Sequence, residues 1–264
     1  MKTWKKWMAL VVGMINFVAV SNTSATEAMI EQDKKVIIGF DDTFAPFGFK
    51  NEQGDIVGFD VDLAKAVFER MGVTYEFQPI DWSTKETELK TGNIDMIWSG
   101  YTVTKERSKV LQFSDAYMDN RQIIVVRKDS KVQTKVDLAG KIVATQAESS
   151  SLAGMLKDTT FVDSIDGQAP VTYATFVEVF ADLDNGRADA IIVDETLATY
   201  FLSKNKQGDS YRILKEHFGE ETYAVGFRKT DTAFVQRFNE ALAAVKKDGT
   251  FAEITKKWFD ELKQ

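Results

Sequence analysis

Cysteine is absent from this 264-residue chain, and histidine occurs once, at His217. Disulfides, thiol nucleophiles and cysteine-based zinc sites are therefore excluded, and most histidine-dependent catalysis lacks a candidate residue. Proline is scarce, with three residues, which argues against long disordered regions. A basic block is also missing. Because the net charge is −7 and the isoelectric point about 5.0, nucleic-acid binding is not expected. No metal or cofactor is indicated.

A stretch at the N-terminus has the layout of a secretory signal peptide. It starts with three lysines, continues with an apolar run over residues 8–20, and ends in small polar residues. We predict that residues 1–25 are this signal, with cleavage near Ala25 or Ala28. Removing three lysines and no acidic residue takes the net charge from −7 to −10.

A membrane anchor is the alternative interpretation of the same stretch. The apolar run is shorter than the roughly 20 residues of a membrane span, and Gly13 and Asn16 interrupt it. No cysteine follows the run, so a lipid anchor there is excluded. The sequence therefore predicts a periplasmic or secreted protein.

Beyond the signal, short apolar runs alternate with segments of helical periodicity. Apolar runs at 36–40, 74–80, 94–98, 141–145, 190–193 and 223–227 are typical of strands. Between them, VDLAKAVFERM, FVEVFADLDNG, ETLATYFLSK and TAFVQRFNEALAAVKKDG carry apolar residues at helical spacing. This rhythm predicts an α/β protein with mostly parallel sheets, in which ligands bind beyond the carboxyl ends of the strands.

An internal repeat divides the chain into two similar halves. The segments ELKTGNIDMI (88–97) and DLDNGRADAI (182–191) share the pattern L-x-x-G-x-x-D-x-I. Each copy describes a helix that ends at glycine and leads into a buried strand. Coincidence is the alternative, because Gly-x-x-Asp turns are common in α/β chains. The repeat favours two α/β lobes with a cleft between them.

The residues that follow the strands indicate what the cleft binds. Arg107 can grip a carboxylate in bidentate fashion, with help from Thr102 and the Ser150 N–H. Asp194, at the tip of the strand AIIV, can meet an ammonium group. A carboxylate beside an ammonium describes an α-amino acid. Phe44 and Trp82 leave room for its side chain.

At the far end of that aromatic slot, Asp41, with Gln146 opposite, would receive a polar or cationic tip. A guanidinium between aromatic faces gains cation–π energy. The predicted substrate-binding residues are Asp41, Phe44, Trp82, Ser99, Gly100, Tyr101, Thr102, Arg107, Gln146, Ser149, Ser150, Ser151 and Asp194. No catalytic residue is predicted.

Each of these residues also has a purely structural interpretation. Phe44 and Trp82 could be ordinary core residues. Arg107 could be a solvated surface charge. Ser149 could be only the N-cap of a helix. Glu148 is expected to be solvated.

Several stretches together resemble the polar amino-acid-binding proteins of bacterial ABC importers, the family of the lysine/arginine/ornithine-, histidine- and glutamine-binding proteins. The resemblance runs from about Lys35 to the C-terminus. It rests on GFDDTFAPF, GFDVDLAKAV, GNIDMIWSGYTVTKERSKVLQFSDAY, VATQAESSS, ADAIIVDE and VGFRKTDTAF through KKDGTFAEITKKWF.

The resemblance implies a two-lobed periplasmic-binding-protein fold, a clamshell with two crossover strands. It implies lobe 1 at residues 31–121 and 226–264 and lobe 2 at residues 122–225. Arg107 with Thr102 and the Ser150 region would then hold the ligand carboxylate. Asp194, with the Gly100 carbonyl and Thr102, would hold its amino group. The implied partners are a small-molecule amino acid and ABC permease subunits, and we expect a monomer.

This sequence departs from the family pattern at four positions. Trp98 and Tyr101 stand where relatives often carry smaller aliphatic residues. Glu148 stands where many carry glycine, and Gln146 stands where glutamine-binding members place a lysine. These departures argue against glutamine and leave larger polar ligands such as cystine open. Because Asp41 lies at the tip of the slot, arginine or lysine is the favoured ligand, with glutamine or cystine as alternatives.

Two other functional classes compete with a transport receptor. Periplasmic dehydratases acting on cyclohexadienyl precursors resemble this family, and for such an enzyme Glu148 is the obvious general acid. A sensor domain of a receptor or kinase is the third possibility, and it is disfavoured because no transmembrane or signalling segment follows.

Overall fold

The computed structural model describes residues 35–204 and 208–260. The predicted signal peptide lies outside these residues. Within the described part of the chain, no helix is long and apolar enough to cross a membrane.

The first sheet has five strands in the order β5-β1-β6-β13-β7. Their bounds are β1 Val36–Phe40, β5 Tyr75–Pro79, β6 Met96–Ile97, β7 Leu111–Phe113 and β13 Gly226–Arg228. The helices of this lobe are α2 Phe59–Met71, α3 Lys85–Thr91, α4 Lys105–Val110, α9 Thr232–Lys247 and α10 Thr250–Phe259. A small sheet of β2 Thr43–Phe44, β3 Gly48–Lys50 and β4 Ile56–Val57 completes it. Helix α2 forms as the periodicity predicts, since Val61, Ala64 and Phe68 are all buried.

The second sheet also has five strands, in the order β10-β9-β11-β8-β12. Their bounds are β8 Met118–Arg127, β9 Val143–Gln146, β10 Val171–Tyr173, β11 Ala190–Asp194 and β12 Tyr211–Tyr223. The helices of this lobe are α5 Ser150–Lys157, α6 Thr159–Ser164, α7 Phe176–Asp184 and α8 Glu195–Lys204. Short 3-10 turns occur at η1 Trp82–Thr84, η2 Val136–Leu138, η3 Asp166–Gln168 and η4 Gly208–Ser210.

Both sheets are mixed, whereas the sequence predicted mostly parallel ones. In each, three neighbouring strands are parallel, and the remaining two pair in antiparallel fashion. The predicted strand 223–227 is also two elements rather than one. Tyr223 ends β12 and Gly226 begins β13, because the chain leaves the second sheet and enters the first at this point.

The two copies of the repeat make the same contacts. Asp95 accepts a hydrogen bond from the Ile37 N–H, and Asp189 accepts one from the Ile142 N–H, both at 3.0 Å. A guanidinium also fastens each helix-to-strand turn through two backbone carbonyls. Arg228 donates to Leu89 and Ile94 in the first lobe, and Arg127 to Leu183 and Ala188 in the second. The repeat therefore marks equivalent turns in two lobes of similar design.

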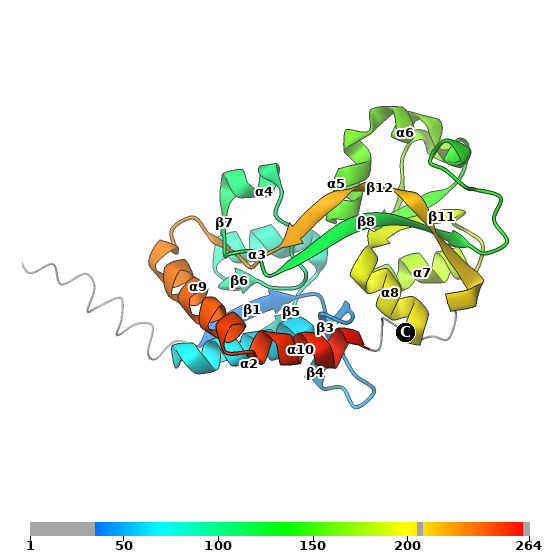
Figure 1. The fold of residues 1–264 in the computed structure, drawn as a ribbon. Coiled ribbons are helices and arrows are strands. Elements are labelled where there is room, and N and C mark those ends of the chain that lie inside the picture. Colours follow the sequence, from blue (N-terminus) through cyan, green and yellow to red (C-terminus); the bar gives the residue numbers. More distant parts are fainter. Residues whose placement is uncertain (1–34, 205–207, 261–264) are drawn as a thin grey trace, which may run out of the picture. The chain divides into compact units, whose positions relative to one another are not determined.

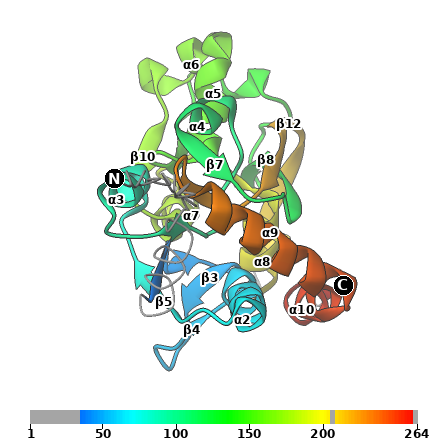
Figure 2. The same ribbon diagram turned by 90° about the vertical axis from the view of Figure 1, so that its left-hand side faces the viewer.

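Strands β8 and β12 run side by side in both views (Figure 1 and Figure 2). Near their first-lobe ends, the Tyr117 N–H donates to the Tyr223 carbonyl and the Val225 N–H to the Ser114 hydroxyl. The predicted boundaries at 121/122 and 225/226 fall within β8 and between β12 and β13. The division into lobes at those residues stays a prediction.

Candidate functional site

Arg107 lies on helix α4, whose N-cap Thr104 accepts a hydrogen bond from the Arg107 N–H at 3.1 Å. Its guanidinium lies over the ring of Tyr101, 4.3 Å from the centroid. Nη1 donates to the Thr102 carbonyl at 2.9 Å. With only 12% of its side chain exposed, Arg107 is not a solvated surface charge. It is a cation held in place by the loop that precedes it.

Asp194 ends strand β11 and is buried. One of its oxygens, Oδ1, accepts from Asn120 Nδ2 at 2.7 Å, Gln122 Nε2 at 2.8 Å and the Tyr223 hydroxyl at 2.5 Å. Burial, and next the charge of Glu221, raise the pKa of Asp194 to about 6. The three donors all use the same oxygen, so the carboxylate is fixed in orientation and can meet an incoming ammonium through the other.

A continuous chain of hydrogen bonds joins these two charged groups across the lobes. The Thr102 hydroxyl contacts the Ser150 hydroxyl at 3.1 Å and the Glu221 carboxylate at 3.0 Å. Gln122 Nε2 donates to Ser150 at 3.2 Å and to Asp194. Arg107 holds the Thr102 backbone at the other end of the chain. The fold thus brings a cation and an anion to opposite ends of one buried polar network.

Asp41 and Gln146 come from different lobes and meet directly. Gln146 Nε2 donates to Asp41 Oδ2 at 2.8 Å and to the Ala174 carbonyl at 2.9 Å. Thr43 donates to Asp41 Oδ1, and the Ser99 hydroxyl accepts from the Asp41 N–H. Burial raises the pKa of Asp41, and the hydrogen bonds from Thr43 and Gln146 oppose that effect.

Phe44 and Trp82, the two aromatic residues of the predicted slot, are buried. Their rings pack against other aromatic side chains of the protein. Phe44 stacks on Phe47, with ring centroids 5.5 Å apart, and lies 6.0 Å from Phe176 of the second lobe. Trp82 packs edge-on against Tyr101 at 5.7 Å. Their direct contact with a ligand stays a prediction.

Helix α5 begins beside this network. Ser149 is its N-cap and accepts from the Leu152 N–H at 3.1 Å, as the structural interpretation predicted. Ser151 is fully buried and its hydroxyl donates to Gln122 Oε1. Tyr101 is also fully buried, and its hydroxyl donates to Glu86 at 2.7 Å. Tyr101 and Ser151 support Arg107 and Gln122, and their direct contact with a ligand stays a prediction.

Gly100 shows why this loop needs a residue without a side chain. Its φ is +52°, and a Cβ here would lie 2.5 Å from Cε1 of Phe44. Its N–H donates to Asp60 Oδ2 at 2.7 Å, and the Tyr117 hydroxyl donates to the same oxygen at 3.0 Å. Asp60 lies in the first turn of α2, and its carboxylate holds the loop at Gly100 through this hydrogen bond.

We expect Asp60 to give the protein a distinctive pH dependence of stability. Burial raises its pKa from 3.8 to about 7. Its contribution to folding is fully present below its usual pKa and is lost as the pH rises through about 7. Between pH 5 and pH 8, the free energy of unfolding of the wild type should fall by about 2–3 kcal/mol relative to Asp60→Asn.

Urea unfolding of both proteins at pH 5 and pH 8 measures this difference. The asparagine side chain does not titrate. The contributions of the other carboxylates to the pH dependence are the same in both proteins and cancel in the difference. Parallel pH profiles for the two proteins would show that Asp60 is charged throughout.

Several residues of this network were not predicted from the sequence, namely Asp60, Lys85, Glu86, Asn120, Gln122, Glu221 and Tyr223. Gln122 carried a usable signal, because a polar residue beginning the apolar run QIIVV is out of place unless its amide is satisfied. Lys85 carried a weaker one: it lies four residues before the buried Leu89 and so on the same face of α3.

Among residues 35–204 and 208–260, no group of three or more histidine, aspartate or glutamate side chains could hold a metal ion. The solvated position expected for the Glu148 side chain is confirmed, since it is exposed. The carboxylate of Asp42, the neighbour of Asp41, lies 2.6 Å from the Lys50 ammonium.

Comparison with known proteins identifies the family. Residues 36–261 match the model of bacterial extracellular solute-binding proteins, family 3. The arginine-binding extracellular protein ArtP of Bacillus subtilis is 32% identical over 257 residues, which cover 97% of this chain and 98% of that protein.

Solved structures agree with this match. The substrate-binding protein of an ABC uptake transporter from Streptococcus pneumoniae, with bound histidine, superimposes with a TM-score of 0.86 at 41% identity, covering 90% of this chain and 98% of the other. An ancestral arginine-binding protein bound to arginine superimposes with a TM-score of 0.78 at 37% sequence identity. The match covers 85% of this chain and 98% of the other. The two-lobed α/β fold is therefore confirmed. This chain belongs to the bacterial extracellular solute-binding proteins, family 3, whose matched members are polar amino-acid-binding proteins of ABC uptake rather than enzymes.

Proposed function

We propose that this protein is an extracytoplasmic receptor that binds a polar or cationic L-amino acid between its lobes and delivers it to the permease subunits of an ABC importer. One observation carries the proposal: a guanidinium and a carboxylate, Arg107 and Asp194, lie at the two ends of a buried hydrogen-bond network that spans both lobes. An α-amino acid carries the complementary pair of charges.

Each charged group has the geometry that its role needs. Arg107 is oriented by the Tyr101 ring and the Thr102 carbonyl. Its Nη2 also approaches the Glu148 carbonyl at 3.4 Å and its Nε lies 3.6 Å from Glu86, which leaves further N–H donors on Nη1 and Nη2 for a carboxylate. Asp194 is oriented by three donors on one oxygen. Because both groups are largely removed from water, their attraction for the ligand's charges is screened less than at the surface.

Selectivity would come from Asp41 at the junction of the lobes. Its carboxylate accepts from Gln146, but carboxylate oxygens can accept more than one hydrogen bond, so a guanidinium or ammonium could join. A charge of −10 after signal cleavage would also steer cationic ligands toward the protein. We propose arginine as the preferred ligand, lysine or ornithine next, and glutamine as a weaker one.

Asp41→Asn should therefore lose more affinity for arginine than for glutamine, by roughly 1.5–3 kcal/mol, the scale of a hydrogen bond to a charged group. Calorimetry with both ligands on both proteins measures this difference. Asp42→Asn is the matched control, since Asp42 is the neighbouring carboxylate but pairs with Lys50 outside the junction. An equal loss for the two ligands would show that Asp41 does not meet the ligand's tip.

A thermal-shift screen of the twenty amino acids with ornithine, citrulline and cystine tests the proposed ligand class. A ligand at 100 times its dissociation constant should add about 2.7 kcal/mol of stability. Arginine should give the largest shift. A larger shift with histidine, glutamine or cystine would overturn the proposed order, and no shift with any of them would overturn the receptor proposal.

A further inference from the structure

Lys85 is a buried cation at the junction of the lobes. Its side chain is 1% exposed, although lysine is almost never fully buried unless its ammonium is paired. Nζ donates to the Trp82 carbonyl at 3.0 Å and to the Glu148 carbonyl at 2.9 Å, and lies 3.2 Å from Glu86 Oε2. It also lies over the Trp82 ring, 4.9 Å from the centroid.

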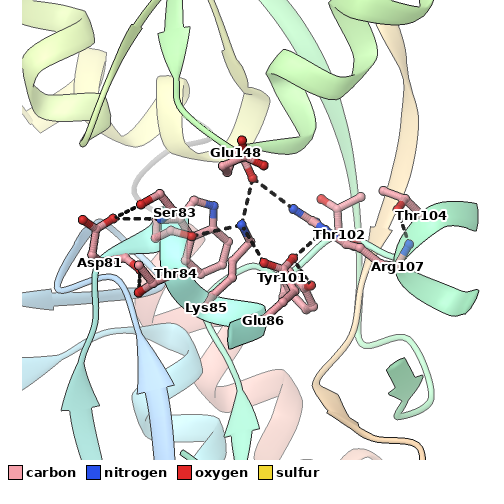
Figure 3. A network of polar contacts seen from close by, with 11 residues as sticks. Asp81, Ser83, Thr84, Lys85, Glu86, Tyr101, Thr102, Thr104, Arg107 and Glu148 are labelled. Carbon is pink, nitrogen blue, oxygen red and sulfur yellow. Dashed lines mark hydrogen bonds and ion pairs between the residues drawn. The ribbon is translucent and has the colours of Figure 1, made fainter. Parts of the chain in front are cut away.

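The contact with Glu148 is the one that joins the lobes, because Lys85 belongs to the first lobe and Glu148 to the second. The Glu148 side chain is exposed, so only its backbone takes part. Arg107 Nη2 approaches the same carbonyl at 3.4 Å (Figure 3). Glu148 has a φ of +52°, a left-handed conformation uncommon for a residue with a side chain. In this conformation the Glu148 carbonyl is directed at the Lys85 ammonium and the Arg107 guanidinium.

The turn that carries Glu148 also carries predicted ligand-binding residues. Gln146 precedes it and contacts Asp41, while Ser149 and Ser150 follow it at the start of α5. The Ser149 hydroxyl donates to the Gln146 carbonyl at 2.7 Å, so this turn is stiff within itself. Fixing the Glu148 carbonyl therefore fixes the place of Gln146 and Ser150 relative to the first lobe.

We propose that Lys85 is a positioning residue for ligand binding, which holds the 146–150 turn of the second lobe against the first lobe in the closed state. The inference rests on the proposed function, since it concerns how that same site is assembled. The donors of Lys85 are directed to Trp82, Glu148 and Glu86. An ammonium has three protons, so none remains for a ligand. Lys85 therefore contributes equally to the binding of every ligand.

The test is Lys85→Met, which keeps the length and the apolar stem but removes the ammonium. Calorimetry with arginine, histidine and glutamine should show a loss of about 10- to 100-fold for each ligand, by the same factor. Small-angle scattering without ligand should show a larger radius of gyration than the wild type, because the closed state has lost a contact. Lys90→Met, an exposed lysine at the other end of α3, is the matched control and should change neither quantity.

Variants of Glu148 test the same contact from the second lobe, and they keep the inference testable should Lys85→Met fold poorly. Glu148→Gly should bind like the wild type within about twofold, because glycine readily adopts a positive φ and keeps the carbonyl in place. Glu148→Val should lose affinity for all three ligands, because a β-branched residue disfavours that backbone conformation.

Three results would overturn the inference. They are wild-type affinities in Lys85→Met, a loss confined to one ligand, which would make Lys85 a ligand contact, and equal effects of Glu148→Gly and Glu148→Val. None of these depends on which amino acid the wild type prefers. A different order of ligand affinities would therefore contradict the proposed selectivity. The role of Lys85 would still be decided by the ratio of variant to wild-type affinity for each ligand.

Discussion

Arg107→Ala is expected to abolish measurable binding of every amino acid while leaving the fold intact. The guanidinium is the cation proposed to meet the ligand's carboxylate, which all amino acids share. Removing one partner of a buried charge pair costs about 2–5 kcal/mol, much of it because the other charge stays buried without a partner. That cost corresponds to a loss of about 30- to 5,000-fold in affinity.

The design of the site makes this loss specific to binding. Arg107 is on a six-residue helix without buried residues, so its removal takes no side chain from the core. Tyr101 keeps its hydrogen bond to Glu86. The melting temperature of the ligand-free variant should therefore stay near that of the wild type.

Two further variants test whether the geometry of the guanidinium and its position on the helix matter for binding. Arg107→Lys keeps the charge but loses the planar pair of donors, so we expect an intermediate affinity. Lys109→Ala removes an exposed cation from the same helix and should leave binding unchanged. Calorimetry with arginine and glutamine compares all four proteins. Normal affinity in Arg107→Ala would rule out its role as the carboxylate partner.

Asp194→Asn should produce a loss of similar size and should also remove a pH dependence. Burial raises the pKa of Asp194 to about 6 in the free protein. A bound ammonium favours the charged carboxylate and so lowers that pKa. Affinity is then complete above pH 6 and falls as the pH drops through it. From pH 7 to pH 5, arginine should bind about tenfold more weakly to the wild type.

Arginine suits this measurement because its own groups do not titrate between pH 5 and pH 7. Asp194→Asn should bind weakly at both values, with no pH dependence from this position. Glu195→Gln is the matched control, since Glu195 is the next residue but pairs with the exposed Arg121. Its pH profile should follow the wild type. A wild-type affinity that is constant from pH 7 to pH 5 would show that the carboxylate does not meet the ammonium.

The sequence by itself determined the elements and most of the charges that matter. Apolar runs and helical periodicity depend on neighbours a few residues away, so VDLAKAVFERM and the L-x-x-G-x-x-D-x-I repeat could be interpreted locally. Asp41 and Asp194 were found because each lies at the tip of a predicted buried strand, and Arg107 because it lies in the polar segment after a third one. The repeat indicated two lobes, and the resemblance added the clamshell with two crossover strands.

Only the tertiary structure decided which of these groups meet and what holds them. The Asp41–Gln146 contact joins residues 105 positions apart, and the Lys85–Glu148 contact joins residues 63 apart. The acceptor in the second pair is a backbone carbonyl, which every residue possesses, so no side-chain pattern can reveal it. Its direction depends on a single positive φ and on how two lobes pack. Of the two cations that share this carbonyl, Arg107 was predicted from the sequence and Lys85 was not, and their common acceptor is defined only by the packing of the two lobes.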